Sequence, residues 1–179
     1  MINICLIINY LVPNAIFYGV QWGDKNDYND IKWYDTRPIP LWQDILDNQD
    51  NAYAEDLRLN ILNQIDDYTK QLINNGFQFD GKNFSLSNNA QINWIALNAN
   101  YLRTKIDKDK SVNLWPDAGF PIPTSDDGVY YLTLDKADDF FNICFPLMVD
   151  IIKSGSDEKD KVLKMNYSDL QSWEDSRKV

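Results

Sequence analysis

The stretch that decides the fold is 74–94, which reads Asn-Asn-Gly-Phe-Gln-Phe-Asp-Gly-Lys-Asn-Phe-Ser-Leu-Ser-Asn-Asn-Ala-Gln-Ile-Asn-Trp. Its Asp80-Gly81 pair is typical of a tight turn of the primed type, in which both central residues adopt positive φ. Such a turn places Phe77 opposite Phe84 in an antiparallel hairpin, with Gln78, Asn83 and Ser85 toward water. The covered face of this hairpin is predicted to be Phe77, Phe79, Phe84 and Leu86.

Helix signals lie on both sides of this hairpin. Gly76 stands where a helix end needs a residue that tolerates positive φ, and Asn88 with Gln91 three residues later matches a capping box. The sequence therefore predicts a helix over 54–75 and another over 90–103. The apolar stripe of the first is Ala54, Leu57, Ile61, Ile65, Tyr68 and Leu72, and that of the second is Trp94, Ile95, Asn98 and Leu102.

A second Asp-Gly turn predicts another hairpin at 125–128, followed by a strand that carries Tyr130, Leu132 and Leu134 on one face. A helix over 135–153 follows, bent at Pro146 and ended or interrupted near Gly155. Ser168 with Gln171 predicts the cap of a last short helix.

The first 23 residues carry no charged side chain. They lack a basic start, and Asn3, Asn9 and Pro13 interrupt the apolar run before the roughly 18 residues that a membrane span needs. We expect buried strands here.

An aromatic hairpin is predicted after this segment. Apolar residues alternate along the chain at Ile16, Tyr18, Val20 and Trp22, and the alternation resumes at Ile31 and Trp33. A short helix over 41–46 and a linker over 47–52 complete this part.

Because strands occur as adjacent pairs, the predicted fold class is α+β, helix-rich, with short antiparallel β-hairpins and no parallel sheet. We divide the chain into a docking element over 1–50 and a helix-hairpin-helix-hairpin-helix module over 51–179.

Composition excludes several classes of function. A net charge of -10 disfavours binding to nucleic acid or to an anionic membrane surface. The chain has no histidine and two cysteines, Cys5 and Cys144, so imidazole-based catalysis and thiolate zinc sites are missing. The calcium-loop pattern that begins at Asp107 lacks the required glycine and glutamate, and Asp24-Lys25-Asn26-Asp27 also fails. We predict no enzyme, no catalytic residue, no metal and no cofactor.

Aromatic side chains are the remaining candidates for function. Trp94 falls on a helix stripe and is expected in the core, whereas Trp22 and Trp33 lie on a hairpin that can have one open face. With Tyr18 on the same hairpin, these residues are the predicted interface. The acidic group Asp135, Asp138 and Asp139 is interpreted as the first turn of a helix, where the helix dipole favours negative charge.

The segment Gly76-Phe77-x-Phe79-Asp80-Gly81-x-x-Phe84, with Ser87 and Ala90-Gln91-x-Asn93 after it, resembles an uncharacterised domain of tailed-bacteriophage tail and appendage proteins. The resemblance covers roughly residues 54–165, and 31–47 is similar to a short preface in phage fibre-associated proteins. It implies a structural or adaptor protein in the virion tail that is oligomeric within an assembly and bound to other tail proteins. Two alternatives stay open: a tail-fibre assembly chaperone that acts in the host cytoplasm, and a receptor- or glycan-binding module.

Overall fold

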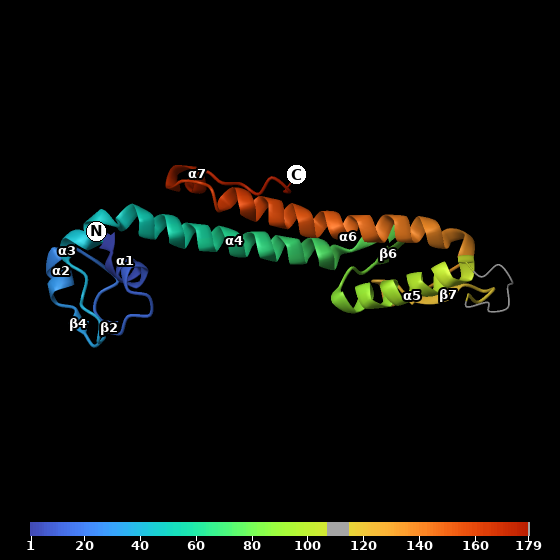
Figure 1. Cartoon of the computed structure of the whole chain (residues 1–179), viewed down its shortest axis with the longest axis horizontal. Coiled ribbons are helices and arrows are strands. Elements are labelled where there is room, and N and C mark those ends of the chain that lie inside the picture. The colour runs from blue at the N-terminus through green and yellow to red at the C-terminus, as the bar shows by residue number, and fades with distance from the viewer. Residues whose placement is uncertain (107–114, 179) are drawn as a thin grey trace. The chain divides into compact units, whose positions relative to one another are not determined.

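A computed structural model describes residues 1–106 and 115–178 (Figure 1). Within these ranges the chain forms seven helices and four two-stranded antiparallel sheets, and each strand pairs with a single neighbour. The predicted fold class, α+β and helix-rich without a parallel sheet, is confirmed for this part of the chain.

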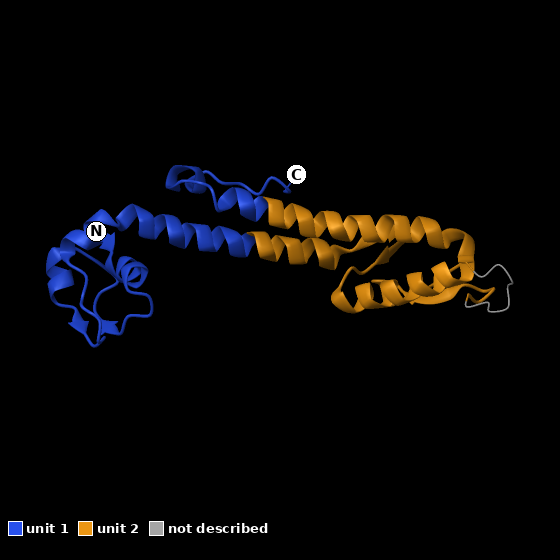
Figure 2. Ribbon diagram, in the orientation of Figure 1, with its two compact units in different colours: residues 1–64, 158–179 blue, residues 65–157 orange. Residues whose placement is uncertain are grey.

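Two compact units make up the chain, one of residues 1–64 with 158–179 and one of residues 65–157 (Figure 2). We call them unit 1 and unit 2. Helices α4 (Gln49–Asn75) and α6 (Leu134–Val162) contribute residues to both units. The predicted linker over 47–52 is wrong except at Asn48, since Asp47 ends helix α3 (Trp42–Asp47) and α4 begins at Gln49. The division at residue 50 falls inside α4.

In unit 2, the predicted hairpin is present with the predicted register. Strands β5 (Phe77–Phe79) and β6 (Lys82–Phe84) pair Phe77 with Phe84, and the turn residues Asp80 and Gly81 have φ of 48° and 71°. Gly76, with φ of 67°, ends α4 as expected. The Asp80 carboxylate accepts hydrogen bonds from Tyr130 Oη at 2.8 Å and Lys136 Nζ at 2.5 Å, which fixes the turn to the second hairpin and to α6.

The core of unit 2 is built around the hairpin phenylalanines. Phe140 on α6 lies with its ring 5.2 Å from that of Phe84 and 5.1 Å from that of Trp94, both in edge-to-face geometry. Aromatic pairs in this geometry stabilise a fold beyond their buried area. The buried members of this core are Phe77, Phe79, Phe84, Leu86, Trp94, Leu97, Tyr101, Trp115, Ile122, Leu132, Ala137, Phe140, Phe141, Cys144 and Ile151.

Helix α5 (Asn88–Ile106) differs from its prediction in two ways. Its cap is Ser87, whose Oγ accepts from the Ala90 N–H at 3.5 Å, while the Gln91 amide donates to the Leu86 carbonyl. Its buried residues are Trp94, Leu97 and Tyr101, whereas Ile95 is 58% and Leu102 47% exposed. The prediction that Trp94 lies in the core is therefore confirmed, whereas the predictions for Ile95 and Leu102 are wrong, because the core face of α5 continues through Leu97 and Tyr101.

Strands β7 (Phe120–Pro123) and β8 (Val129–Leu132) form the second predicted hairpin, with Asp127 in the left-handed region at φ of 59°. Leu132 is buried as expected, but Leu134 is 42% exposed because α6 begins there. Pro146 is tolerated inside α6, and Gly155 is a buried helical residue that does not end it.

In unit 1, the expectation of buried strands near the N-terminus is wrong. Ile4–Leu11 is helix α1, capped by Asn3, whose side chain accepts from the Leu6 N–H at 3.0 Å. Ile4, Ile7 and Ile8 are fully buried at helical spacing, and the helix stops ahead of Pro13. Strand β1 (Ile2–Asn3) pairs with β3 (Trp22–Gly23).

The predicted aromatic hairpin is also rearranged. Strand β2 (Phe17–Tyr18) pairs with β4 (Lys32–Trp33), and helix α2 (Lys25–Asn29) lies between β3 and β4 in the chain. Helix α3 (Trp42–Asp47) follows as expected. The buried residues of this smaller core are Ile4, Ile7, Ile8, Tyr28, Ile45 and Ala52.

The C-terminal part of unit 1 contains α7 (Tyr167–Gln171). Its cap is Asn166, which accepts from the Asp169 N–H at 3.0 Å, and so the capping box predicted at Ser168 is wrong. Arg58 on α4 donates to the Met165 carbonyl at 3.1 Å and holds the start of this segment.

Candidate interaction surface

The two faces of the β2–β4 sheet differ in what covers them. On the inner face, Phe17 and Trp33 are directly opposite, with ring centroids 6.0 Å apart in a stacked arrangement. The next pairs along the sheet place Tyr18 opposite Lys32, and the Tyr34 N–H donates to the Ile16 carbonyl at 2.8 Å. Since side chains alternate between faces along a strand, Ile16, Tyr18, Lys32 and Tyr34 share the other face.

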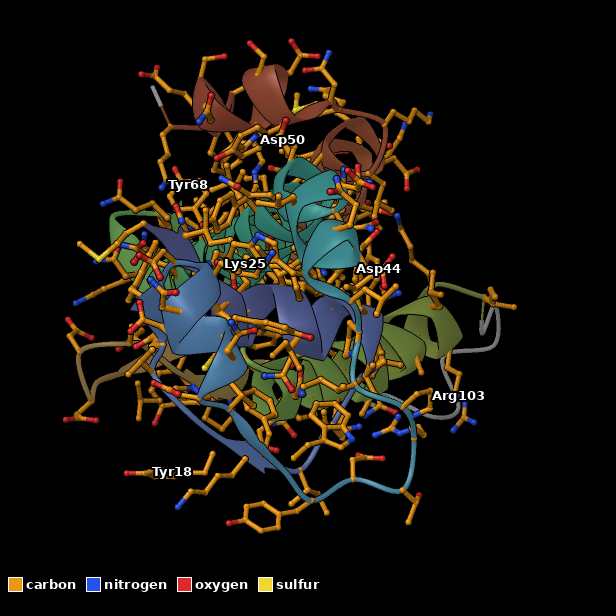
Figure 3. All side chains as sticks on the ribbon, turned by 90° about the vertical axis from the view of Figure 1, so that its left-hand side faces the viewer. Tyr18, Lys25, Asp44, Asp50, Tyr68 and Arg103 are labelled. Carbon is orange, nitrogen blue, oxygen red and sulfur yellow. The ribbon has the colours of Figure 1, made fainter. Side chains whose placement is uncertain are left out.

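Ile16, Tyr18 and Tyr34 are the large apolar side chains of this face, and we call these three residues the β2–β4 outer patch; the exposed Lys32 lies beside them. Ile16 is 64% exposed, Tyr18 72% and Tyr34 64%. Figure 3 shows the Tyr18 side chain directed away from the ribbon. Tyrosines on a rigid sheet offer contact area and a hydrogen-bonding hydroxyl at a small entropic cost, which suits a protein interface.

Hydrogen bonds to the Asp35 carboxylate connect the two strands at the end of this sheet. The Asp35 carboxylate accepts from both Nε and Nη2 of Arg37, at 2.9 and 2.6 Å, and from the Ile16 N–H at 3.3 Å. Arg37 also donates to the Pro13 carbonyl at 3.0 Å. The hydrogen bonds from Arg37 hold the pKa of Asp35 well below its usual range. These hydrogen bonds tie Ile16 and Pro13 to the segment that follows β4, beside the outer patch.

The structure separates the three predicted interface residues. Tyr18 lies in the outer patch, whereas Trp22 is 52% exposed on the other sheet of unit 1. Trp33 packs internally on Phe17, and its indole N–H donates to the Arg37 carbonyl at 2.6 Å. Ile16 completes the alternation with Tyr18, but Tyr34 was missed because its face follows from the β2–β4 register.

A groove of about 310 Å³ lies between α1 and α4 in unit 1. Its apolar wall includes Leu6, Tyr10 and Leu59, and Glu55 and Asp56 form its acidic side. Glu55 is already paired with Arg58 at 2.6 Å, and Asp56 accepts from the Asn60 amide at 3.4 Å. Both carboxylates thus have partners within their own helix.

The acidic residues have structural roles that differ in part from those predicted. Asp24 and Asp27 form a capping box at the start of α2, where a solvated loop was expected. Of the three residues predicted in the first turn of a helix, only Asp135 lies in the first turn of α6, and Asp138 and Asp139 follow it. Asp138 pairs with Lys105, and the hydrogen bond from this lysine lowers the pKa of Asp138. A hydrogen bond from Thr133 lowers the pKa of Asp135 at the start of α6.

Both cysteines are free thiols, and Cys144 is buried whereas Cys5 is partly exposed. Burial raises the pKa of Cys144 to about 12 and also raises the pKa of Cys5. Both thiols are therefore protonated at neutral pH, and a thiolate is the form that attacks electrophiles or binds metals.

Glu158 is a buried carboxylate near the end of α6, with 3% of its surface exposed. It accepts hydrogen bonds from Lys161 Nζ at 2.8 Å, Ser176 Oγ at 2.8 Å and Trp173 Nε1 at 3.1 Å. Burial acts to raise the pKa of Glu158, but these three donors outweigh it and leave the pKa lowered. These hydrogen bonds hold Trp173 and Ser176 of the C-terminal segment against α6.

The described residues contain no group of three or more histidine, cysteine or acidic side chains placed to hold a metal ion. The failed calcium pattern at Asp107 begins outside the described residues. Among the described helices, none has the length and apolar character to cross a membrane.

A scan of the sequence against protein-family models finds no match, and searches of curated proteins and of solved structures find none either.

Proposed function

We propose that this chain is a non-enzymatic adaptor that binds a partner protein through the β2–β4 outer patch. The proposal rests on the contrast between the two faces of the β2–β4 sheet. Phe17 and Trp33 stack on the inner face, whereas the side chains of Ile16, Tyr18 and Tyr34 on the outer face are 64 to 72% exposed. A monomer gains nothing from three large side chains in water, whereas an interface uses such residues as its anchors.

The setting we propose is a bacteriophage tail, with other tail proteins as partners. It rests on the likeness of Gly76-Phe77-x-Phe79-Asp80-Gly81-x-x-Phe84 to the tail and appendage domain. Within this likeness, the segment forms the end of α4 and the β5–β6 hairpin.

Deletion of the uncharged residues 1–23 is not an informative test of this proposal. The deletion removes Ile4, Ile7 and Ile8 from the core of unit 1, so a loss of assembly would then reflect unfolding. Substitution on the outer patch keeps the core intact. The informative variant is Tyr18→Ser with Tyr34→Ser, and its matched control is Tyr131→Ser, a strand tyrosine of unit 2 that is 57% exposed.

The experiment is quantitative mass spectrometry of particles from a phage that carries this gene, complemented with each variant. The wild-type chain and the control should follow particles through a density gradient at a constant copy number. The double variant should remain folded by circular dichroism and leave the particles, because losing two tyrosine anchors costs about 4 kcal/mol or more. Retention of the double variant would contradict a docking role for the patch.

The same mass spectrometry measurement tests the chaperone alternative, and a glycan array tests the glycan-binding alternative. A wild-type chain that occurs in the infected-cell lysate and is missing from particles favours the assembly chaperone in the host cytoplasm. A glycan-binding module instead predicts saturable binding on a glycan array that the Tyr18→Ser change removes.

A further inference from the structure

Helix α5 carries a second apolar stripe on the side away from its buried residues. Ile92 is 65% exposed, Ile95 58%, Leu102 47% and Ile106 74%. With the exposed Ala99 between them, they follow one another at intervals of three, four, three and four residues. This is the seam spacing of a helix that packs lengthwise on another helix.

The stripe is distinct from the core contacts of α5. Trp94, Leu97 and Tyr101 are 3 to 6% exposed and fill the core of unit 2, where Trp94 contacts Phe84 and Phe140. The helix therefore has one covered and one uncovered apolar face. Water-exposed isoleucines at seam spacing are costly unless something covers them.

Charge indicates what covers the stripe. The chain has a net charge of -10, so two copies repel each other over most of their surface. Helix α5 has no acidic residue, and from Asn88 to Leu102 it has no charged residue at all. Its surface is thus a place where two copies can approach without electrostatic repulsion.

The spacing of the stripe is also self-complementary. We propose that the outer face of α5 packs against the same face of a second copy, antiparallel and with a two-fold axis near Ala99. This arrangement brings Ile92 beside Ile106 of the second copy and Ile95 beside Leu102 of the second copy, as a two-fold interface requires. Ala99 at the centre allows the two helix axes to come close.

The antiparallel direction follows from the ends of the helix. The basic residues of α5 are in its last turn, where Lys105 is paired with Asp138 and Arg103 is exposed. A parallel pair would bring both basic last turns together, whereas an antiparallel pair places them at opposite ends.

Analytical ultracentrifugation of the full chain over a concentration series tests the interface. We expect a reversible dimer with a dissociation constant of roughly tens of micromolar, because the stripe is a small interface. Ile95→Asp enters the symmetric contact twice and should raise that constant at least about 100-fold. The matched control is Ile152→Asp on α6, also in unit 2 and 51% exposed, which should leave it unchanged.

Circular dichroism should show equal helix content in both variants. A wild-type chain that stays monomeric at several hundred micromolar overturns the proposal, as does a dimer that Ile95→Asp leaves intact. The double variant at Tyr18 and Tyr34 should still dimerise, so this proposal and the proposed adaptor function fail independently.

Cross-linking tests the direction, in a Cys5→Ser background that leaves only the buried Cys144. A short bis-maleimide should join a chain with Ile92→Cys to a chain with Ile106→Cys when the two are mixed. Chains with Ile92→Cys alone should stay unlinked. Efficient linking of Ile92→Cys alone would show a parallel pair and overturn the antiparallel seam.

Discussion

At the scale of single residues, Glu158 shows how burial and hydrogen bonding compete. Removing a carboxylate from water is costly, and Glu158 has only 3% of its surface left exposed. Lys161, Ser176 and Trp173 each donate to it, and together they overcome the effect of burial on its pKa. The residue therefore stabilises the fold only in its charged form.

We predict that Glu158→Gln lowers the free energy of unfolding at pH 7 by about 2 kcal/mol, the usual worth of hydrogen bonds to a charged group. Because the pKa of Glu158 is lowered in the folded state, its contribution is present above the unfolded pKa of about 4.3 and disappears as pH falls through the folded value. Urea denaturation from pH 7 down to pH 3 should show the difference between wild type and variant shrinking.

The control for this prediction is Asp157→Asn, which removes an exposed carboxylate one residue away. It should change stability by less than about 0.5 kcal/mol at pH 7. A Glu158→Gln variant as stable as wild type at pH 7 would show that the three donors do not favour the charged carboxylate.

At the scale of elements, two glycines at the β5–β6 hairpin have the same backbone conformation but different space for a side chain. Gly76 and Gly81 both have positive φ, at 67° and 71°. A Cβ on Gly76 would lie 1.9 Å from the Phe84 carbonyl oxygen, whereas a Cβ on Gly81 meets nothing within 4 Å. Only the first position also requires the close approach of two backbones.

We predict that Gly81→Ala costs about 1 kcal/mol, the penalty for an L-residue with left-handed backbone. Gly76→Ala should cost roughly 3 kcal/mol or more, because the end of α4 and strand β6 must also move apart. Chemical denaturation of both variants measures the difference. Equal costs at the two positions would mean that the contact with Phe84 is relieved without loss.

The elements that sequence predicted well are those whose signal is local. Asp80-Gly81 determines the turn, the register and the covered face of β5 and β6 within eight residues. The isoleucine-rich run 2–12 carries no such signal, since β-branched apolar residues suit a buried strand or a buried helix equally. Asn3 as a cap and the spacing of Ile4, Ile7 and Ile8 were the available indications of α1.

The candidate surfaces were harder to predict because exposure is a tertiary property. Helix α5 has apolar residues on two faces, and its sequence predicts Trp94 in the core but does not say that Leu97 faces the core while Ile95 does not. Tyr34 likewise became a surface candidate only through its pairing with Ile16. Periodicity showed which residues share a face, and the packing partners decided which face is covered.

At the scale of the whole molecule, the two units have cores of different size. Among the described residues, the cluster around α1 in unit 1 has six buried members, with Ile61, Val162 and Leu170 buried apart from it, whereas the cluster of unit 2 has fifteen. Local stability follows the amount of buried apolar surface, so the amides of unit 1 should open at lower free energy than those of unit 2. Helices α4 and α6 contribute to both units, and their own amides therefore report on each.

We predict that hydrogen exchange followed by mass spectrometry shows weaker protection for peptides from α1 and α3 than for peptides from β6 and the Phe140 segment of α6. Ile7→Ala should lower the stability of unit 1 by about 2 to 5 kcal/mol, because it leaves a cavity at a fully buried side chain. Exchange should then accelerate in α1 and α3, while peptides from β6 and from the Phe140 segment keep their wild-type rates. If every peptide instead accelerates by the same factor, the chain unfolds as one cooperative body and the two cores do not act separately.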